Sequence, residues 1–149
     1  MKRIVSLILF VLVLGVASAG AASVPRSELA LGPVAFGDSK ARVTELLGEP
    51  TERNLQNGGQ DVIWNYNQSF YIYFSGERMA WMMATEGCTM ATPSGIAVGA
   101  PETVLSGYGE TYSDDVIGGV REVAFWAPGR LLLEFAVKNG KIRLIRVSH

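Results

Sequence analysis

Residues 34–50 read VAFGDSKARVTELLGEP, and residues 95–110 read GIAVGAPETVLSGYGE, so the second stretch echoes the first. Each stretch carries apolar residues at helical spacing between a helix-start signal and a glycine. In the first stretch, Asp38 or Ser39 can cap a helix and Gly48 can end it. In the second, Pro101 suits the first helical position and Gly107 closes the helix. The echo predicts one unit that occurs twice along the chain.

After each stretch the apolar period falls from about 3.6 to 2, which indicates strands. The expected strands are residues 62–66, 70–74, 78–84, 120–126, 130–137 and 141–147. Asn139-Gly140 is a strong signal for a two-residue hairpin turn. Two tandem units of one helix and three antiparallel strands predict an α+β fold, with a six-stranded sheet and both helices on one face. We expect a single domain over residues 20–149, with repeats at about 31–84 and 93–149; two loosely packed units are the alternative.

The first residues have the pattern of a secretory signal peptide. Lys2 and Arg3 precede an apolar run from Ile4 to Val16, and small residues follow at 17–19. We expect a signal peptide over residues 1–19, cleaved after Ala19 or alternatively after Ala21. The apolar run is shorter than the roughly 20 residues that a membrane-spanning helix needs, and no cysteine lies near the cleavage site. The pattern predicts a periplasmic or secreted protein whose mature form has no lipid anchor and no transmembrane helix.

The charge and the cysteine content exclude further classes. The 149 residues include 13 basic and 14 acidic side chains. Loss of Lys2 and Arg3 leaves 11 basic against 14 acidic residues, a net charge of about −3. Nucleic-acid binders usually carry a concentrated basic patch, which is absent, so we expect no nucleic-acid partner. Cys88 is the one cysteine and cannot form an internal disulfide; an inert apolar side chain is the expected role and a reactive thiol the alternative.

The chain offers few groups for catalysis or metal binding. His149 is the sole histidine and the last residue, so neither a zinc tetrad nor a Cys-His pair can be assembled. Asp114 and Asp115, near Tyr108 and Glu110, could form a carboxylate pair or a calcium site, but the spacing of a calcium loop is missing. We therefore expect no enzyme activity, no catalytic residue, no metal and no cofactor.

Large aromatic residues occupy strand positions that should face water. A sheet covered on one face alternates apolar and polar residues, yet Tyr71 and Tyr73 alternate with other large apolar residues, and Trp81 and Trp126 break the alternation in later strands. Tyrosine and tryptophan are common at interfaces. We therefore predict that Tyr71, Tyr73, Trp81 and Trp126 bind a partner from the uncovered sheet face. The alternative is that these residues reflect strand propensity and that residues 20–33 partly cover this face.

Four short motifs resemble those of a known family. They are Gly37-Asp38-Ser39, Leu47-Gly48-Glu49-Pro50, Trp64-Asn65-Tyr66 and Phe74-Ser75-Gly76-Glu77-Arg78. In this order they resemble the SmpA/OmlA (BamE-like) superfamily, and their doubled arrangement over residues 31–149 is similar to the β-lactamase-inhibitor-protein-like architecture. The chain lacks the lipobox cysteine of BamE-like lipoproteins and the disulfides of the inhibitors.

The resemblance implies a cell-envelope protein that works by binding another protein. We expect an exported protein-binding module whose partner is an envelope or exported protein. A small-ligand or lipid-binding module is the alternative, and an enzyme of another type is the least expected class.

Overall fold

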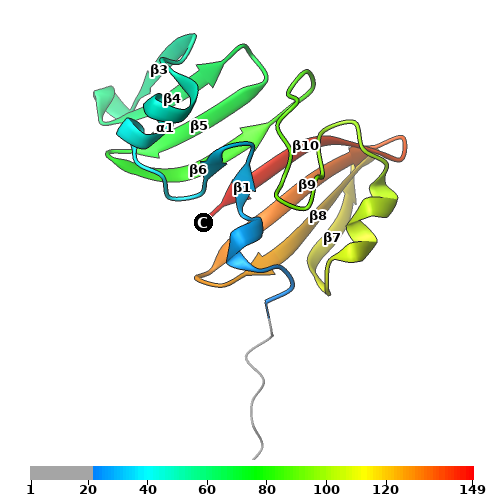
Figure 1. The fold of residues 1–149 in the computed structure, drawn as a ribbon. Coiled ribbons are helices and arrows are strands. Elements are labelled where there is room, and N and C mark those ends of the chain that lie inside the picture. The colour runs from blue at the N-terminus through cyan, green and yellow to red at the C-terminus, as the bar shows by residue number, and fades with distance from the viewer. Residues whose placement is uncertain (1–21) are drawn as a thin grey trace, which may run out of the picture.

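The protein is built around one large sheet in the computed structural model, which describes residues 22–149. Eight antiparallel strands follow one another in the order β3-β4-β5-β6-β10-β9-β8-β7 (Figure 1). Their bounds are β3 (Glu52–Gln56), β4 (Asp61–Tyr66), β5 (Phe70–Ser75), β6 (Arg78–Ala84), β7 (Thr111–Ile117), β8 (Val120–Ala127), β9 (Leu131–Lys138) and β10 (Lys141–Ser148). A separate two-stranded sheet joins β1 (Ala30–Leu31) to β2 (Val34–Ala35).

The strand order is symmetric about the centre of the large sheet. Each half is a four-stranded meander, β3 to β6 or β7 to β10, and the last strands of the two halves pair with each other. Four residue pairs join β6 to β10, and Met82 with Val147 is among them. Because backbone pairing runs through this junction, the two halves share one continuous sheet.

The predicted α+β fold with six strands is wrong, because the chain is mainly β. Within residues 22–149, only one helix exceeds six residues, α1 (Lys40–Leu47); the expected second helix is a short 3₁₀ helix, η3 (Glu102–Gly107). Thr103, Val104, Ser106 and Gly107 have weaker helix propensity than residues 40–47, where alanine, leucine, lysine, arginine and glutamate dominate. The six expected strands are present to within about a residue at each end, but β3 and β7 were missed and extend the sheet at both edges.

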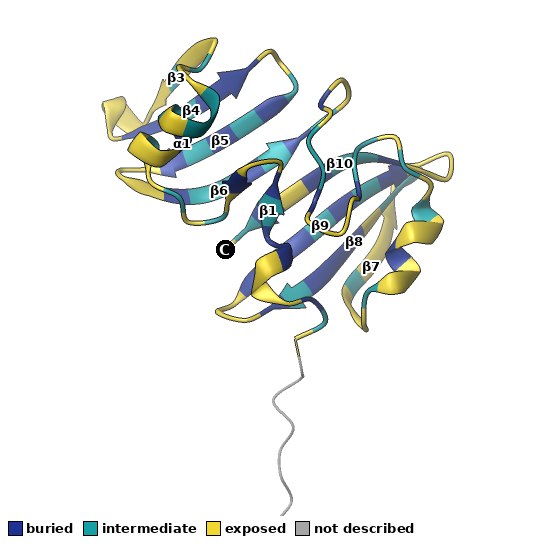
Figure 2. Ribbon diagram, viewed as in Figure 1, coloured by how far each residue is buried: buried dark blue, intermediate teal, exposed yellow. Residues whose placement is uncertain are grey.

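A single apolar core fills one side of the large sheet. Many of its fully buried side chains come from the inner strands, among them Phe70, Ile72, Phe74, Leu133 and Phe135. The helix α1 contributes Val43, and Leu46 and Leu47 pack against the same core. Of the two expected caps, the Ser39 side chain accepts a hydrogen bond from the Arg42 amide at 3.1 Å. Figure 2 shows the inner strands buried and the outer surfaces of α1 and η3 exposed.

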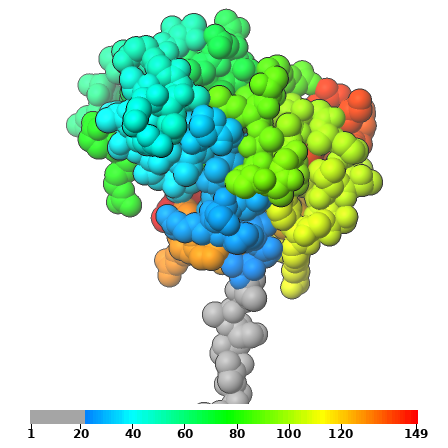
Figure 3. Space-filling view, in the orientation of Figure 1, coloured from blue at the N-terminus to red at the C-terminus, as the bar shows by residue number. Residues whose placement is uncertain are grey.

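The remaining segments cover this same side of the sheet. The N-terminal segment, with the 3₁₀ helix η1 (Arg26–Glu28), is fixed by the amides of Ser23 and Val24, which donate to the Trp126 carbonyl at 2.8 and 3.1 Å. Val24, Leu29 and Leu31 belong to the core. Figure 3 shows this segment beside α1, residues 85–101 and η3 on one face of the molecule. The alternative in which residues 20–33 cover the tyrosine-bearing face is wrong for residues 22–33.

Two further predictions concern the turn at Asn139-Gly140 and the signal peptide at the N-terminus. Asn139 and Gly140 have φ values of 54° and 72°, the conformation that a two-residue hairpin turn requires, which confirms the predicted turn between β9 and β10. The predicted signal peptide and its cleavage at Ala19 lie outside the described residues. In the part that is described, no helix has the length and apolar character needed to span a membrane.

Candidate functional site: the open face of the sheet

The side of the large sheet opposite the core is its open face. The helices α1, η1 and η3 and the β1–β2 hairpin pack on the core side (Figure 1). Successive side chains of a strand point to opposite faces, so alternate residues of each strand reach the open face. The strand register then determines which of these residues are neighbours.

One line of side chains crosses the open face through both halves of the sheet. Directly paired positions run from Ile63 on β4 to Tyr73, Trp81, Ser148, Leu132 and finally Trp126 on β8. We call these six residues the apolar row, since Ser148 is the single polar member. All six are half-buried. Five inter-strand steps of about 4.8 Å give the row a length of about 24 Å.

Two stacked aromatic pairs stiffen this row. The rings of Tyr73 and Trp81 lie 5.6 Å apart between centroids with an interplanar angle of 27°. Trp126 stacks on Tyr112 of β7 with centroids 5.0 Å apart and an angle of 21°. Tyr112 lies at a bulge in the β7–β8 pairing and is 61% exposed. Stacked pairs lose little rotamer freedom on binding, because their geometry is already fixed.

Three of the four predicted partner-binding residues therefore lie in one row. Tyr73, Trp81 and Trp126 belong to the apolar row, with Ser148 and Leu132 between the two tryptophans. Tyr71 lies on the same face in the neighbouring row, paired with Asn65 and Met83. The structure brings Tyr73 and Trp81 into contact and leaves Trp126 in the other half of the sheet.

Tyr73 also has a structural role. Its hydroxyl donates a 2.8 Å hydrogen bond to Asp61, a buried carboxylate that also accepts from Asn57 and from the Gly76 amide. The hydrogen bonds from Asn57 and Tyr73 lower the pKa of Asp61, and the bond to Asp61 raises the pKa of Tyr73. Replacement of Tyr73 therefore disturbs the hydrogen bonds around Asp61 as well as the open face.

The neighbouring row carries charge at its centre. It runs from Met83 on β6 across the junction to Arg146, Glu134, Ala124 and Ser113 in the second half of the sheet. Glu134 accepts two hydrogen bonds from Arg146 at 2.8 and 2.6 Å and one from Ser148 at 2.7 Å. Burial alone would raise the pKa of Glu134, but the bonds from Arg146 and Ser148 outweigh it and lower the pKa. The pair is thus ionised and held in one geometry.

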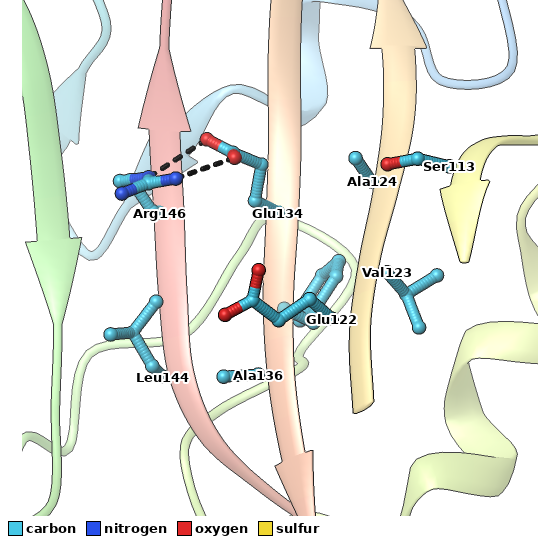
Figure 4. Close-up of a pocket in the computed structure, with 9 residues that line it drawn as sticks. Ser113, Glu122, Val123, Ala124, Glu134, Ala136, Leu144 and Arg146 are labelled. Atoms are coloured by element: carbon cyan, nitrogen blue, oxygen red, sulfur yellow. Dashed lines mark hydrogen bonds and ion pairs between the residues drawn. The ribbon is translucent and has the colours of Figure 1, made fainter. Parts of the chain in front are cut away.

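A pocket lies on the open face beside this ion pair. It has a volume of about 120 Å³ and is lined by Ser113, Glu122, Val123, Ala124, Glu134, Phe135, Ala136, Leu144 and Arg146. Figure 4 shows the side chains of Glu122, Glu134 and Arg146 around it, on β8, β9 and β10. We call it the open-face pocket. It adjoins the apolar row, since Ala124 and Glu134 are each two residues from a row member on the same strand.

The acidic candidates for catalysis do not converge. Arg121 binds Asp114 through two bonds at 2.7 and 2.6 Å and also binds Glu102 at 2.8 Å. A second pocket, of about 550 Å³ beneath η3, is lined by Tyr108 and Arg121 but by none of Asp114, Asp115 and Glu110. Within residues 22–149, no group of three or more His, Cys, Asp or Glu side chains could hold a metal ion.

Two other candidates do not line the open-face pocket. Cys88 is buried in the loop that follows β6, and burial raises the pKa of its thiol. A thiol with a raised pKa is less reactive, because the thiolate is the nucleophile. His149 is exposed at the last position of the chain. Neither residue lines the open-face pocket.

No protein-family model, curated protein or solved structure matches this chain. The resemblance to the SmpA/OmlA (BamE-like) superfamily therefore stays a prediction from four short motifs.

Sequence reasoning missed half of the open face. Leu132, Glu134, Arg146 and Tyr112 were not proposed as site residues, although the first three lie in expected strands at the correct parity. Parity shows which face a residue occupies, but the β6–β10 pairing decides which residues are neighbours. That pairing joins residues more than 60 positions apart and leaves no local pattern in the sequence.

Proposed function

We propose that the protein is an exported protein-binding module that docks an envelope or exported protein on the open face of its sheet. The observation that carries the proposal is the apolar row, in which five of six side chains are apolar or aromatic across six adjacent strands. Contiguous apolar surface on a folded protein usually marks an interaction site. Export is inferred from the signal-peptide pattern of residues 1–19.

The shape of the open face favours a protein over a small ligand. The row is about 24 Å long, which suits the extended contact of a protein interface. The open-face pocket, at about 120 Å³, is smaller than the roughly 300–1,000 Å³ of small-molecule sites. A β-sheet presents its side chains from a hydrogen-bonded frame, so little conformational entropy is lost on docking. A lipid or small-ligand module is the second candidate, and the experiment below includes it.

The test is affinity capture with variants of the apolar row. We expect Trp81→Ala combined with Leu132→Ala to reduce capture of one stoichiometric companion from the native envelope fraction by at least about tenfold, since central aromatic anchors dominate interface energies. Leu55→Ala is the matched control: Leu55 is 68% exposed and lies on the edge strand β3, away from the row. Tyr73 is left intact because of its bond to Asp61.

The purified companion is then titrated against the parent protein, the Trp81→Ala/Leu132→Ala double variant and the Leu55→Ala control. Thermal unfolding of each protein checks that it is folded. Equal capture by the double variant and the Leu55→Ala control would refute docking through the apolar row. Binding to vesicles of envelope lipids that is lost in the double variant, with no protein companion, would instead support the lipid-binding candidate.

A further inference from the structure

The open-face pocket has an apolar floor and a charged rim. Ala124 on β8 and Ala136 on β9 form part of the floor, and Leu144 on β10 lies opposite Ala136. Larger side chains surround these small ones, which is why the surface is hollowed at this point. Glu122 on β8 pairs with Ala136 on the other side, and Figure 4 shows its carboxylate over β9, near Glu134.

The charge of the rim is not balanced. Glu134 is neutralised by Arg146. Glu122 makes no hydrogen bond or ion pair with any residue in the 22–149 range, although its charge helps to raise the pKa of Arg146. Its directly paired neighbour on β7 is Asp115, which has no ionic partner there either. Like charges placed directly opposite in a sheet are destabilising. Glu122, Glu134 and Asp115 against Arg146 and Lys138, which ends β9 on the same face, leave this part of the open face with a formal charge of −1.

Lysine and arginine side chains match both properties of the pocket. Each has an apolar stem that packs on apolar surface and a cationic head that reaches a polar rim. Here the stem would lie on the alanine floor and the head would meet Glu122. A volume of about 120 Å³ holds several waters or one such side chain. A divalent cation matches less well, because it needs several oxygen ligands at once and residues 22–149 provide no such group.

We propose that the open-face pocket receives an arginine or lysine side chain of the partner protein, with its head paired to Glu122. This proposal rests on the proposed function, because the pocket adjoins the apolar row and one partner would fill both. It adds the chemistry of the partner: a basic residue next to the apolar residues that contact the row. The cationic side chain relieves the repulsion between Glu122 and Asp115, and this relief favours binding.

The test uses a small probe and does not require the partner. N-acetyl-arginine methylamide is titrated into the isotope-labelled protein and followed by amide chemical shifts. N-acetyl-citrulline methylamide, which has nearly the same shape and no charge, is the matched control. We expect saturable shifts at Ala124, Ala136 and Ser113 with the arginine probe and much smaller shifts with citrulline. Glu122→Gln should weaken arginine binding about fivefold, the size expected of a partly exposed ion pair.

Glu45→Gln serves as the control variant, since it removes the same charge from α1 on the covered side. Equal binding of arginine and citrulline, or equal binding by the Glu122→Gln and Glu45→Gln variants, would overturn the proposal. So would calcium chloride shifting these amides while the arginine probe does not. If the arginine probe does not bind while capture still depends on Trp81 and Leu132, the pocket proposal fails and the proposed function stands. If the arginine probe binds while capture is independent of those two residues, only docking through the apolar row fails.

Discussion

Glu28 is a carboxylate buried between three segments that cover the core. It accepts a 2.6 Å hydrogen bond from the Tyr108 hydroxyl after η3, and bonds from the hydroxyl and amide of Ser94 in the preceding loop. Burial alone would raise the pKa of Glu28, but the bonds from Ser94 and Tyr108 lower it below its ordinary value of 4.5. Burial and the bond to Glu28 raise the pKa of Tyr108 to about 12. The ionised carboxylate thus links the N-terminal segment to the rest of the covering layer.

This arrangement predicts how stability depends on pH. Because the pKa of Glu28 is lower in the folded state, its contribution is complete above about pH 4.5 and is lost as the pH falls through the folded-state value. We expect Glu28→Gln to reduce the free energy of unfolding by about 1–3 kcal/mol at pH 7, and the difference from the parent to shrink below pH 4. Urea titrations at several pH values measure both. A constant difference across the range would contradict the prediction. Glu45→Gln, which removes only an exposed ion pair with Arg42, should change the urea midpoint by much less.

At the scale of elements, the helix α1 depends on the residue that precedes it. Ser39 caps the helix by accepting from the Arg42 amide, and the Gly48 amide closes its other end on the Thr44 carbonyl. Asp38 has a different role, since its carboxylate accepts from the Ala35 amide at 2.9 Å. The sequence alone does not decide which of these two residues caps the helix, because Ser and Asp are equally good N-cap residues. The contact that decides between them lies in the turn after β2.

The cap can be tested by two replacements at one position. We expect Ser39→Ala to destabilise the protein by about 1 kcal/mol, since one amide of the first turn loses its acceptor. Ser39→Asp keeps an acceptor and adds a favourable charge at the helix start, so it should retain the parent stability. Chemical denaturation of the three proteins measures the difference. Equal losses in both variants would show that the side-chain oxygen does not matter.

The edge strands show why only part of the fold was predictable. The six inner strands bury one face, so their sequences alternate and were found. The strands β3 and β7 are exposed on nearly every residue, and the sequence ERNLQ of β3 carries no apolar period. Edge strands often carry charge, which prevents unwanted pairing. Nothing in the sequence therefore indicated that Asp114 and Asp115 lie in a strand, β7.

At the scale of the whole molecule, the open face exists only because the two halves share one sheet. The apolar row crosses the β6–β10 junction between Trp81 and Ser148, so its length depends on that pairing. Sequence patterns within each half predicted its three inner strands but could not supply the register between halves. The apolar row therefore depends on the β6–β10 pairing as much as on the residues that form it.

The core side of the junction gives a test of this dependence. Met82 is fully buried at β6 and pairs with Ile72 in its own half and with Val147 in the other. We expect Met82→Ala to reduce the free energy of unfolding by about 2–5 kcal/mol, because a cavity opens in the core. If the halves unfold as one unit, the most protected amides of β5 and of β9 should lose protection by the same amount in native-state hydrogen exchange. Leu55→Ala is the control and should leave the protection of both strands unchanged. A loss of protection confined to β5, with β9 unchanged, would mean that the two halves unfold separately. The apolar row would then be assembled from two independent parts.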